Sequence, residues 1–372
     1  MIGPFSIDTY LPSFPDIARD FGVGLAAMAQ TLSVYLIAFA VTTLVWGPLA
    51  DAFGRRRVVL GAMLLYVLTS FGCAFTDNLP HMLILRLMQG TAASGGIVIA
   101  RAVIRDVYDG PQARRAMAQV MMMFALAPAA APIIGGWLHE WLGWRSVFHF
   151  LALYGLLTAG LMLWILPETH PPQLRQSIHP RAVSGNYLAA LRHGRFLAMV
   201  LTFCFCFGGL FLYIVGSPAI IFDHLGLGAN SFAIQFVPMV AGVMAGSWLA
   251  GRLSSLLAPA RTVNIAMGLA GLAVLLNLAQ ACWLEPKPLT VVAPLVLYAF
   301  AVALSMPNLT VMALDCFPRN RGMASAVQAF IQMTINALIP AFAVPIVASS
   351  LRDFALAQGG FLLLSVLLWR RS

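Results

Sequence analysis

Two ionisable residues lie inside long apolar runs, where a charged side chain either has a use or is costly. Asp8 falls in the run 2–18, and Arg86 falls in the run 80–104. If the first run is a membrane helix, a rise of about 1.5 Å per residue puts Asp8 roughly 12 Å into a hydrocarbon core about 30 Å thick. A charge there costs on the order of 2.5 to 3.5 kcal/mol, so Asp8 should face a cavity or be protonated part of the time.

Reversible proton binding is the chemistry that suits Asp8. A carboxylate that binds a proton in one state and releases it in another can couple proton flow to a second process. We therefore predict that Asp8 is a proton-coupling residue. The alternative is a carboxylate near a helix end that merely reaches toward water. Pro12 has no N–H to donate to the carbonyl of Asp8, so the backbone should loosen at that turn.

Arg86 poses a different problem, because an arginine cannot lose its charge in a protein. It needs a carboxylate, carbonyl oxygens or water around it. Small and apolar residues at 90, 93 and 97 follow it on one helical face, which ends at Arg101. Such a face either packs closely against another helix or lines a cavity. Arg101 is equally well explained by a side chain that extends to the membrane interface.

A polar stripe marks a later apolar run. Its members, three or four residues apart, are Ser325, Gln328, Gln332 and Asn336. Polar residues on an apolar helix either join neighbouring helices or form the wall of a wet cavity. We favour the cavity, lined by Gln328, Gln332 and Asn336.

Prolines and glycines are concentrated in the run 115–138. They are Pro128, Pro132, Gly135 and Gly136. Proline removes a backbone donor, and glycine lets a neighbouring helix approach closely. This helix should therefore bend and pack tightly, and packing alone would account for the pattern.

A short polar segment, 47–57, joins two apolar runs and reads Gly-Pro-Leu-Ala-Asp-Ala-Phe-Gly-Arg-Arg-Arg. We expect it to be a loop in which Gly47 and Gly54 form turns and Asp51 is the one carboxylate. Arginines in a loop this short are costly to carry across a bilayer, so the loop should be cytoplasmic.

The composition indicates what positions these residues. The chain has 60% hydrophobic and 9% charged residues with a mean hydropathy of +0.87, which indicates an all-α integral membrane protein. At about 20 residues per span, the 372 residues hold roughly a dozen transmembrane helices. The expected twelve spans are 2–18, 27–50, 58–77, 80–104, 115–138, 145–167, 196–222, 231–251, 262–283, 289–312, 321–348 and 353–370. No basic stretch precedes the first run, so a cleaved signal peptide is not expected.

The longest polar interval divides the chain. We expect an N-terminal half, 1–167, a cytoplasmic linker, 168–195, and a C-terminal half, 196–372. Alternating the spans across the membrane puts most of the 22 basic residues on one side, which predicts that both termini are cytoplasmic. A weak internal repeat relates the two halves: Asp106-Val-Tyr followed by Arg115-Ala-Met-Ala is echoed by Asp315-Cys-Phe followed by Arg321-Gly-Met-Ala.

Other classes of function find little support. The net charge of +9 is scattered over small loop clusters, so we expect no nucleic-acid partner. The five cysteines lack metal-ligand spacing, so we expect no metal and no other cofactor. Neither a nucleophile elbow nor a paired-histidine motif is present, so we expect no enzyme and no catalytic residues. Isolated polar residues without a repeated ring argue against a passive channel.

Several motifs together carry a resemblance to a known family. They are Ser-Ile-Asp8-Thr-Tyr-Leu-Pro12, Ser33-Val-Tyr35-Leu-Ile, the 47–57 segment, Arg86-x-x-Gln89-Gly90, Arg101-x-x-x-Arg105-Asp106 and Ala131-Pro132-x-x-Gly135-Gly136. The 47–57 segment resembles the signature of the major facilitator superfamily. The whole set resembles its bicyclomycin-resistance (Bcr/CflA) subfamily of drug/proton antiporters.

This resemblance implies a twelve-helix fold in two six-helix halves, in a bacterial inner membrane. We expect a monomer. The resemblance also implies proton-coupled efflux of small, partly apolar compounds, including antibiotics, by alternating access. Asp8 would exchange protons, and Arg86 would face the substrate cavity with Tyr35 and Gln89. A conformational latch would be formed by Gly47, Asp51, Gly54, Arg55, Arg56, Arg105 and Asp106, with Asp51 near the helix N-terminus at Gly322. The alternatives are an exporter of a metabolite such as an amino acid, short peptide or siderophore, and a membrane sensor or scaffold.

Overall fold

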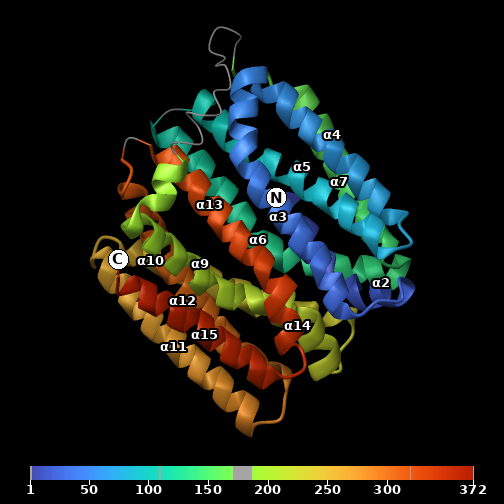
Figure 1. The fold of residues 1–372 in the computed structure, drawn as a ribbon, viewed down its shortest axis with the longest axis vertical. Coiled ribbons are helices and arrows are strands. Elements are labelled where there is room, and N and C mark those ends of the chain that lie inside the picture. The colour runs from blue at the N-terminus through green and yellow to red at the C-terminus, as the bar shows by residue number, and fades with distance from the viewer. Residues whose placement is uncertain (1, 109, 171–186, 319, 372) are drawn as a thin grey trace. The chain divides into compact units, whose positions relative to one another are not determined.

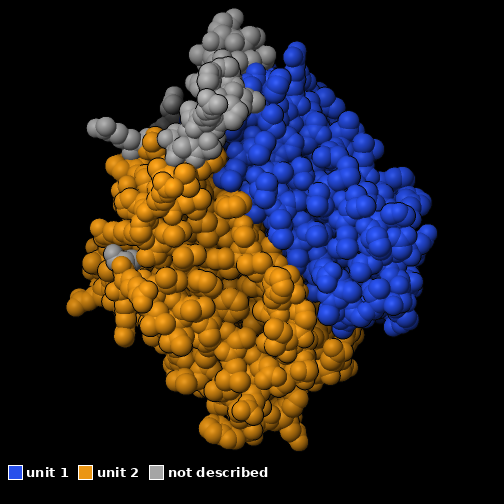
Figure 2. Space-filling view, viewed as in Figure 1, with its two compact units in different colours: residues 1–183 blue, residues 184–372 orange. Residues whose placement is uncertain are grey.

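The fold was analysed in a computed structural model, which describes residues 2–108, 110–170, 187–318 and 320–371. Within helices, the side chains of 105, 110, 111, 113–115, 117, 118 and 121–125 lie outside this description. The described backbone is all-helical and contains no strand. The chain divides into two compact units, residues 1–183 and 184–372 (Figure 2). The predicted linker, 168–195, spans that division, and its residues 171–186 are outside the described part.

Unit 1 (Met1–Val183) opens with a broken helical segment and continues with long helices. They are α1 (Ile2–Asp8), the 3-10 turn η1 (Leu11–Ser13), α2 (Phe14–Asp20), α3 (Leu25–Phe53), α4 (Arg55–Ala74), α5 (Leu79–Val107), α6 (Gly110–Leu142) and α7 (Arg145–Ile165). Within this unit, α4 packs against both α5 and α7, and α3 packs along α5 (Figure 1).

Unit 2 (Ser184–Ser372) also consists of long helices joined by short helical turns. It contains α9 (Gly194–Val215), the π-helical turn η3 (Ala219–His224), η4 (Ala229–Ser231), α10 (Phe232–Leu253), α11 (Pro259–Trp283), α12 (Pro288–Asp315), α13 (Arg321–Leu338), the π-helical turn η5 (Ile339–Ala343), α14 (Val344–Val347) and α15 (Leu351–Trp369). Here α12 packs against α9, α10 and α11, and α15 packs against α9 and α11.

Ten helices of the described residues are long and apolar enough to cross a membrane. The first segment is not among these ten, because it is divided into short pieces. Nor is α6, several of whose side chains lie outside the described part. The membrane-spanning, all-helical class is thus confirmed, and the count of twelve spans stays a prediction.

The break in the first segment has a covalent cause. The α-helix ends at Asp8 and is followed by η1. Proline at 12 and at 15 removes two of the N–H donors that an α-helix would need at this point. Asp8 is therefore the last residue of α1, beside the irregular backbone at Thr9 and Tyr10.

The expectation of a loop at 47–57 was wrong. Helix α3 runs to Phe53 and α4 begins at Arg55, so Gly54 alone separates them. Gly54 has a φ of +97°, a backbone region that favours glycine over any residue with a Cβ. Gly47 instead lies inside α3, where helical hydrogen bonding continues past Pro48. The polar residues of the 47–57 segment therefore lie at the end of α3 and the start of α4 rather than in a loop.

The contact between α3 and α5 yields a stability prediction. A Cβ added at Gly90 would overlap the carbonyl oxygen of Tyr35, whereas one added at Gly61 on α4 would meet nothing within 4 Å. Gly90→Ala should therefore destabilise the protein by about 1–3 kcal/mol through overpacking. Gly61→Ala should be neutral or slightly stabilising, because alanine favours a helix. Thermal unfolding of both purified variants checks this, and equal melting temperatures would contradict it.

Candidate functional site

Arg86 forms the centre of a buried site in unit 1. Its side chain is fully buried in α5. Nη1 donates hydrogen bonds to the carbonyl oxygen of Ser6 at 3.1 Å and to Oε1 of Gln89 at 2.5 Å. The guanidinium carbon lies 4.8 Å from the ring centroid of Tyr10 and 4.5 Å from that of Tyr35. A cation between two aromatic faces is stabilised without a carboxylate, most strongly where water is excluded.

Further hydrogen bonds tie this centre to neighbouring helices. Gln89 Nε2 donates to Ser70 Oγ of α4 at 2.7 Å. The hydroxyls of Ser6 and Tyr66 are 2.6 Å apart, which joins α1 to α4. The hydroxyls of Tyr10 and Thr31 are 3.0 Å apart, which joins the break after α1 to α3. The Arg86 site therefore holds α1, α3, α4 and α5 in one arrangement.

The guanidinium of Arg86 has hydrogen-bond donors that no described residue uses. Its Nε and Nη2 atoms are buried and have no hydrogen-bond partner among the described residues. Buried polar groups are usually paired, and an unpaired donor costs about 1–3 kcal/mol. The site can therefore accept an additional oxygen from water, a ligand or a protein carboxylate after a local change.

Asp8 lies close to this site without pairing with it. Its side chain is 4% exposed, and it forms no ion pair in the described part of the chain. Asp8 is two residues beyond Ser6, whose carbonyl accepts from Arg86. It is also close enough to the phenol of Tyr35 for an electrostatic interaction. The predicted proton-coupling carboxylate and the predicted cavity arginine thus occupy one buried region of unit 1.

The glycines of α6 contact the same region. A Cβ added at Gly135 would overlap the carbonyl oxygen of Thr9, the residue after Asp8. Gly136 is also buried, and both Pro128 and Pro132 lie inside the continuous helix. Gly135 therefore allows α6 to pack closely against the break after α1, which gives this residue a structural role. A hinge function for these four residues stays a proposal.

A second cluster surrounds Arg55, where α3 meets α4. The Arg55 guanidinium forms ion pairs with Asp51 one turn earlier and with Asp106 near the end of α5, the latter at 3.0 Å. The backbone N–H of Arg55 donates to Glu168 Oε1 at 2.8 Å. Arg56 donates to the carbonyl oxygen of Leu163 in α7 at 2.7 Å. These contacts tie α3, α4, α5 and the segment after α7 together; the side chain of Arg105 is outside the described part.

Glu168 is a member of this cluster that sequence reasoning missed. The sequence predicts Glu168 at the start of the linker, yet its carboxylate accepts a hydrogen bond from the first N–H of α4. A carboxylate at a helix N-terminus is stabilised by the free N–H groups and by the helix dipole. The neighbouring Thr169 hydroxyl donates to Asp106 Oδ2 at 3.2 Å. The only sequence signal was an acidic residue directly after the Leu166-Pro167 end of an apolar run.

The polar stripe of α13 lies in unit 2. Gln328 is buried and its Nε2 donates to Thr310 Oγ1 of α12 at 3.2 Å. Asn336 is buried as well, and Gln332 is half-buried. Oε1 of Gln328 and Oδ1 of Asn336 have no hydrogen-bond partner among the described residues. Gln328 thus joins two helices, and Gln328 and Asn336 each keep an acceptor oxygen that no described residue uses.

Unit 2 also contains a neutral polar cluster that we did not predict. Asn277 Nδ2 of α11 donates to the Tyr213 hydroxyl at 2.6 Å and to Gln358 Oε1 at 2.9 Å. These three buried residues join α9, α11 and α15. The buried residues of unit 2 in the described part include no charged side chain. Buried charge is thus found in unit 1, at Asp8, Arg55 and Arg86.

The described residues contain no group of three or more His, Cys, Asp or Glu side chains that could hold a metal ion. Separately, the buried carboxyl of Asp8 can bind a proton, and the guanidinium of Arg86 can bind an anion or a dipole.

Comparisons with known proteins agree on one family. The family model described as "Major Facilitator Superfamily" matches residues 1–369. The chain is 26% identical to a bicyclomycin resistance protein homolog of Haemophilus influenzae, over 99% of this chain and 92% of that protein. It is 30% identical to multidrug resistance protein D of Escherichia coli, over 87% of this chain and 81% of that protein. The crystal structure of a D-xylose-proton symporter matches with a TM-score of 0.77 at 17% identity, over 99% of this chain and 94% of that one.

Proposed function

The chain belongs to the major facilitator superfamily, and from this we propose that it exports small, partly apolar compounds in exchange for protons. Relatives that match over most of their length are named for resistance to bicyclomycin or to multiple drugs, which supports efflux as the direction of transport. The observation that carries the coupling proposal is the buried carboxylate of Asp8, which forms no ion pair among the described residues and lies two residues beyond the Ser6 carbonyl that accepts from Arg86. Neither group contributes an ion pair to the fold of the described residues.

In the proposed mechanism, Asp8 binds a proton when the cavity is empty and loses it when substrate or a cation arrives. An ionised carboxylate is costly in a buried site unless a cation or donors compensate for it. In this proposal the unused Nε and Nη2 donors of Arg86 compensate for the ionised form once a change of the irregular backbone at Thr9 and Tyr10 brings the two groups together. Proton binding and substrate binding then oppose each other, which is what exchange requires.

We further propose that Tyr35, Arg86 and Gln89 contact substrate in unit 1. For unit 2 we propose the α13 residues Gln328, Gln332 and Asn336 as polar contacts for substrate. Transport then follows alternating access. We place the protein in a bacterial inner membrane as a monomer with both termini cytoplasmic, because that orientation puts most basic residues on the cytoplasmic side.

The test of this function is transport by the full-length chain. An efflux-deficient bacterial host that expresses it should become less susceptible to some compounds of a drug panel, and a proton uncoupler should remove the protection. Purified protein in vesicles should move the same compounds when a pH gradient is imposed. Resistance that survives collapse of the proton gradient would contradict proton coupling. An unchanged susceptibility to the whole panel, with transport of a metabolite instead, would contradict drug efflux.

The cluster around Arg55 is the proposed latch, and it provides a second prediction. Asp51 is 44% exposed and pairs with Arg55, so it is available to a second partner in another state. Asp51→Asn should slow transport roughly tenfold, since a hydrogen bond to a charged group contributes about 1.5–3 kcal/mol. Folding should be unchanged. Asp77→Asn, which alters an exposed carboxylate paired with Arg145, is the matched control; full activity of Asp51→Asn in vesicles would show that Asp51 only supports the helix junction.

A further inference from the structure

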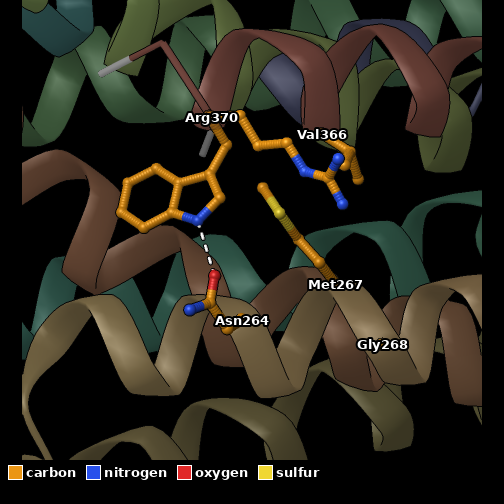
Figure 3. Close-up of a pocket in the computed structure, with 6 residues that line it drawn as sticks. Asn264, Met267, Gly268, Val366 and Arg370 are labelled. Atoms are coloured by element: carbon orange, nitrogen blue, oxygen red, sulfur yellow. Dashed lines mark hydrogen bonds between the residues drawn. The ribbon is translucent and has the colours of Figure 1, made fainter.

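Unit 2 contains a pocket lined by residues of two long helices and the residue that follows one of them. It opens between α11 and the end of α15, has a volume of about 630 Å³, and is lined by Asn264, Met267, Gly268, Val366, Trp369 and Arg370 (Figure 3). Volumes of this order suit small ligands or the headgroup of a larger one. None of these six residues belongs to the Arg86 site, the Arg55 cluster or the α13 stripe.

One hydrogen bond fixes the polar wall of this pocket. Trp369 Nε1 donates to Asn264 Oδ1 at 2.6 Å (Figure 3). Because an indole N–H can only donate, the amide of Asn264 must present its oxygen to Trp369. The Nδ2 group of Asn264 then remains as a donor, and no hydrogen bond of Nδ2 is formed within the described part. The pocket therefore offers hydrogen-bond donors on this wall.

The other polar group is a cation, Arg370, for which the described residues supply no counterion. Arg370 is exposed and forms no ion pair or hydrogen bond with a described side chain. Neither α11 nor the stretch 362–371 contains an Asp or Glu residue. Arg371 and Arg261 add positive charge at the same helix ends, the end of α15 and the first turn of α11. The ligand that complements Arg370 and Asn264 is an anion with several acceptor oxygens, as a phosphate group has.

The surroundings of the pocket favour a lipid as the source of that phosphate. The pocket lies near the ends of two helices that are long and apolar enough to span a membrane, and tryptophan and arginine are typical of the boundary expected there. Met267 and Val366 form an apolar wall beside the polar one. A Cβ added at Gly268 would meet nothing within 4 Å, so the pocket is open along α11. The apolar side chains of Ile265 and Leu272 are exposed on the same helix.

We propose that this pocket binds the phosphate headgroup of an anionic phospholipid such as phosphatidylglycerol. The phosphate accepts hydrogen bonds from Arg370 and Asn264, while the acyl chains follow the apolar outer surface of α11. Basic pockets between membrane helices at the membrane surface are a known setting for anionic headgroups. The proposal requires that the chain spans a membrane and does not depend on what it transports.

Lipid binding to the purified full-length chain can be measured by native mass spectrometry with added phosphatidylglycerol or phosphatidylcholine. Wild-type protein should bind phosphatidylglycerol in preference to phosphatidylcholine. Arg370→Gln should weaken phosphatidylglycerol binding about tenfold, as expected for loss of a charge-assisted hydrogen bond. Gly268→Leu should weaken it to a similar extent by filling the pocket, since the added side chain meets open space rather than protein.

Two matched variants separate this pocket from diffuse attraction. Arg371→Gln removes a neighbouring charge that does not line the pocket, and Gly360→Leu enlarges a glycine of α15 that also faces open space. Both should bind phosphatidylglycerol as the wild type does. If Arg370→Gln and Arg371→Gln weaken phosphatidylglycerol binding equally, the lipid is attracted by non-specific charge and the proposed pocket is wrong. If millimolar inorganic phosphate displaces the lipid and the protein binds the two lipids equally well, the occupant is a free phosphate ion and not a lipid.

Discussion

Asp8→Asn should abolish proton-driven accumulation of substrate while the protein folds and inserts normally. Asparagine has nearly the shape of the protonated carboxyl but can neither release nor bind a proton. Asp8 forms no ion pair in the described part, so the substitution removes no ion-pair stabilisation from the fold. Substrate binding and exchange down a concentration gradient should survive, because they do not require a change of protonation. The expected loss is at least about a hundredfold in coupled transport, the scale on which a positioned proton-transfer group acts.

Reconstituted vesicles with a pH-sensitive dye and an imposed substrate gradient measure this directly. Asp16→Asn is the matched control, because Asp16 is a partly exposed acid of α2 that pairs with Arg19 and contacts His139. It should retain substrate-triggered proton movement. If the same proton movement persists in Asp8→Asn, another group carries the proton, and the proposal for Asp8 is wrong even though efflux itself could continue.

Arg86→Lys should eliminate transport at near-normal expression. Lysine keeps the positive charge but loses the planar group that lies between Tyr10 and Tyr35 and that donates to Ser6 and Gln89. A desolvated cation–π contact contributes about 2 kcal/mol, and a charge-assisted hydrogen bond about 1.5–3 kcal/mol. Together they correspond to a decrease of at least about a hundredfold in transport, if the same geometry is needed in the transport cycle.

A surface arginine in a similar setting provides the control. Arg145 lies 4.3 Å from the ring centroid of Trp144 and pairs with Asp77, but its side chain is 43% exposed. Arg145→Lys should transport at close to the wild-type rate, because water and salt weaken such contacts. Uptake by vesicles, normalised to the amount of folded protein, compares the two variants. Activity of Arg86→Lys equal to that of wild type would mean that Arg86 acts as a point charge only.

Composition and periodicity predict much of this protein without any coordinates. Long apolar runs are sufficient to indicate membrane helices, because an unsatisfied backbone cannot cross a bilayer. Asp8 and Arg86 attract attention for the same reason, since a charge in an apolar run is costly wherever the helix packs. The break after Asp8 follows from the missing N–H of Pro12, which is a covalent property of the residue.

Tertiary structure decided which groups meet. Sequence spacing left open whether Arg86 would face a carboxylate, carbonyls or water. The fold supplies the rings of Tyr10 and Tyr35 and the carbonyl of Ser6 from segments distant in the chain, while Gln89 is a neighbour on the same helix. It also brings Glu168 to the start of α4, a contact between residues 113 positions apart. Local rules predicted a turn at 47–57, but α3 continues to Phe53 because only Gly54 adopts positive φ. Hydrogen-bond partners and helix ends depend on how helices pack, and packing is a property of residues that are distant in sequence.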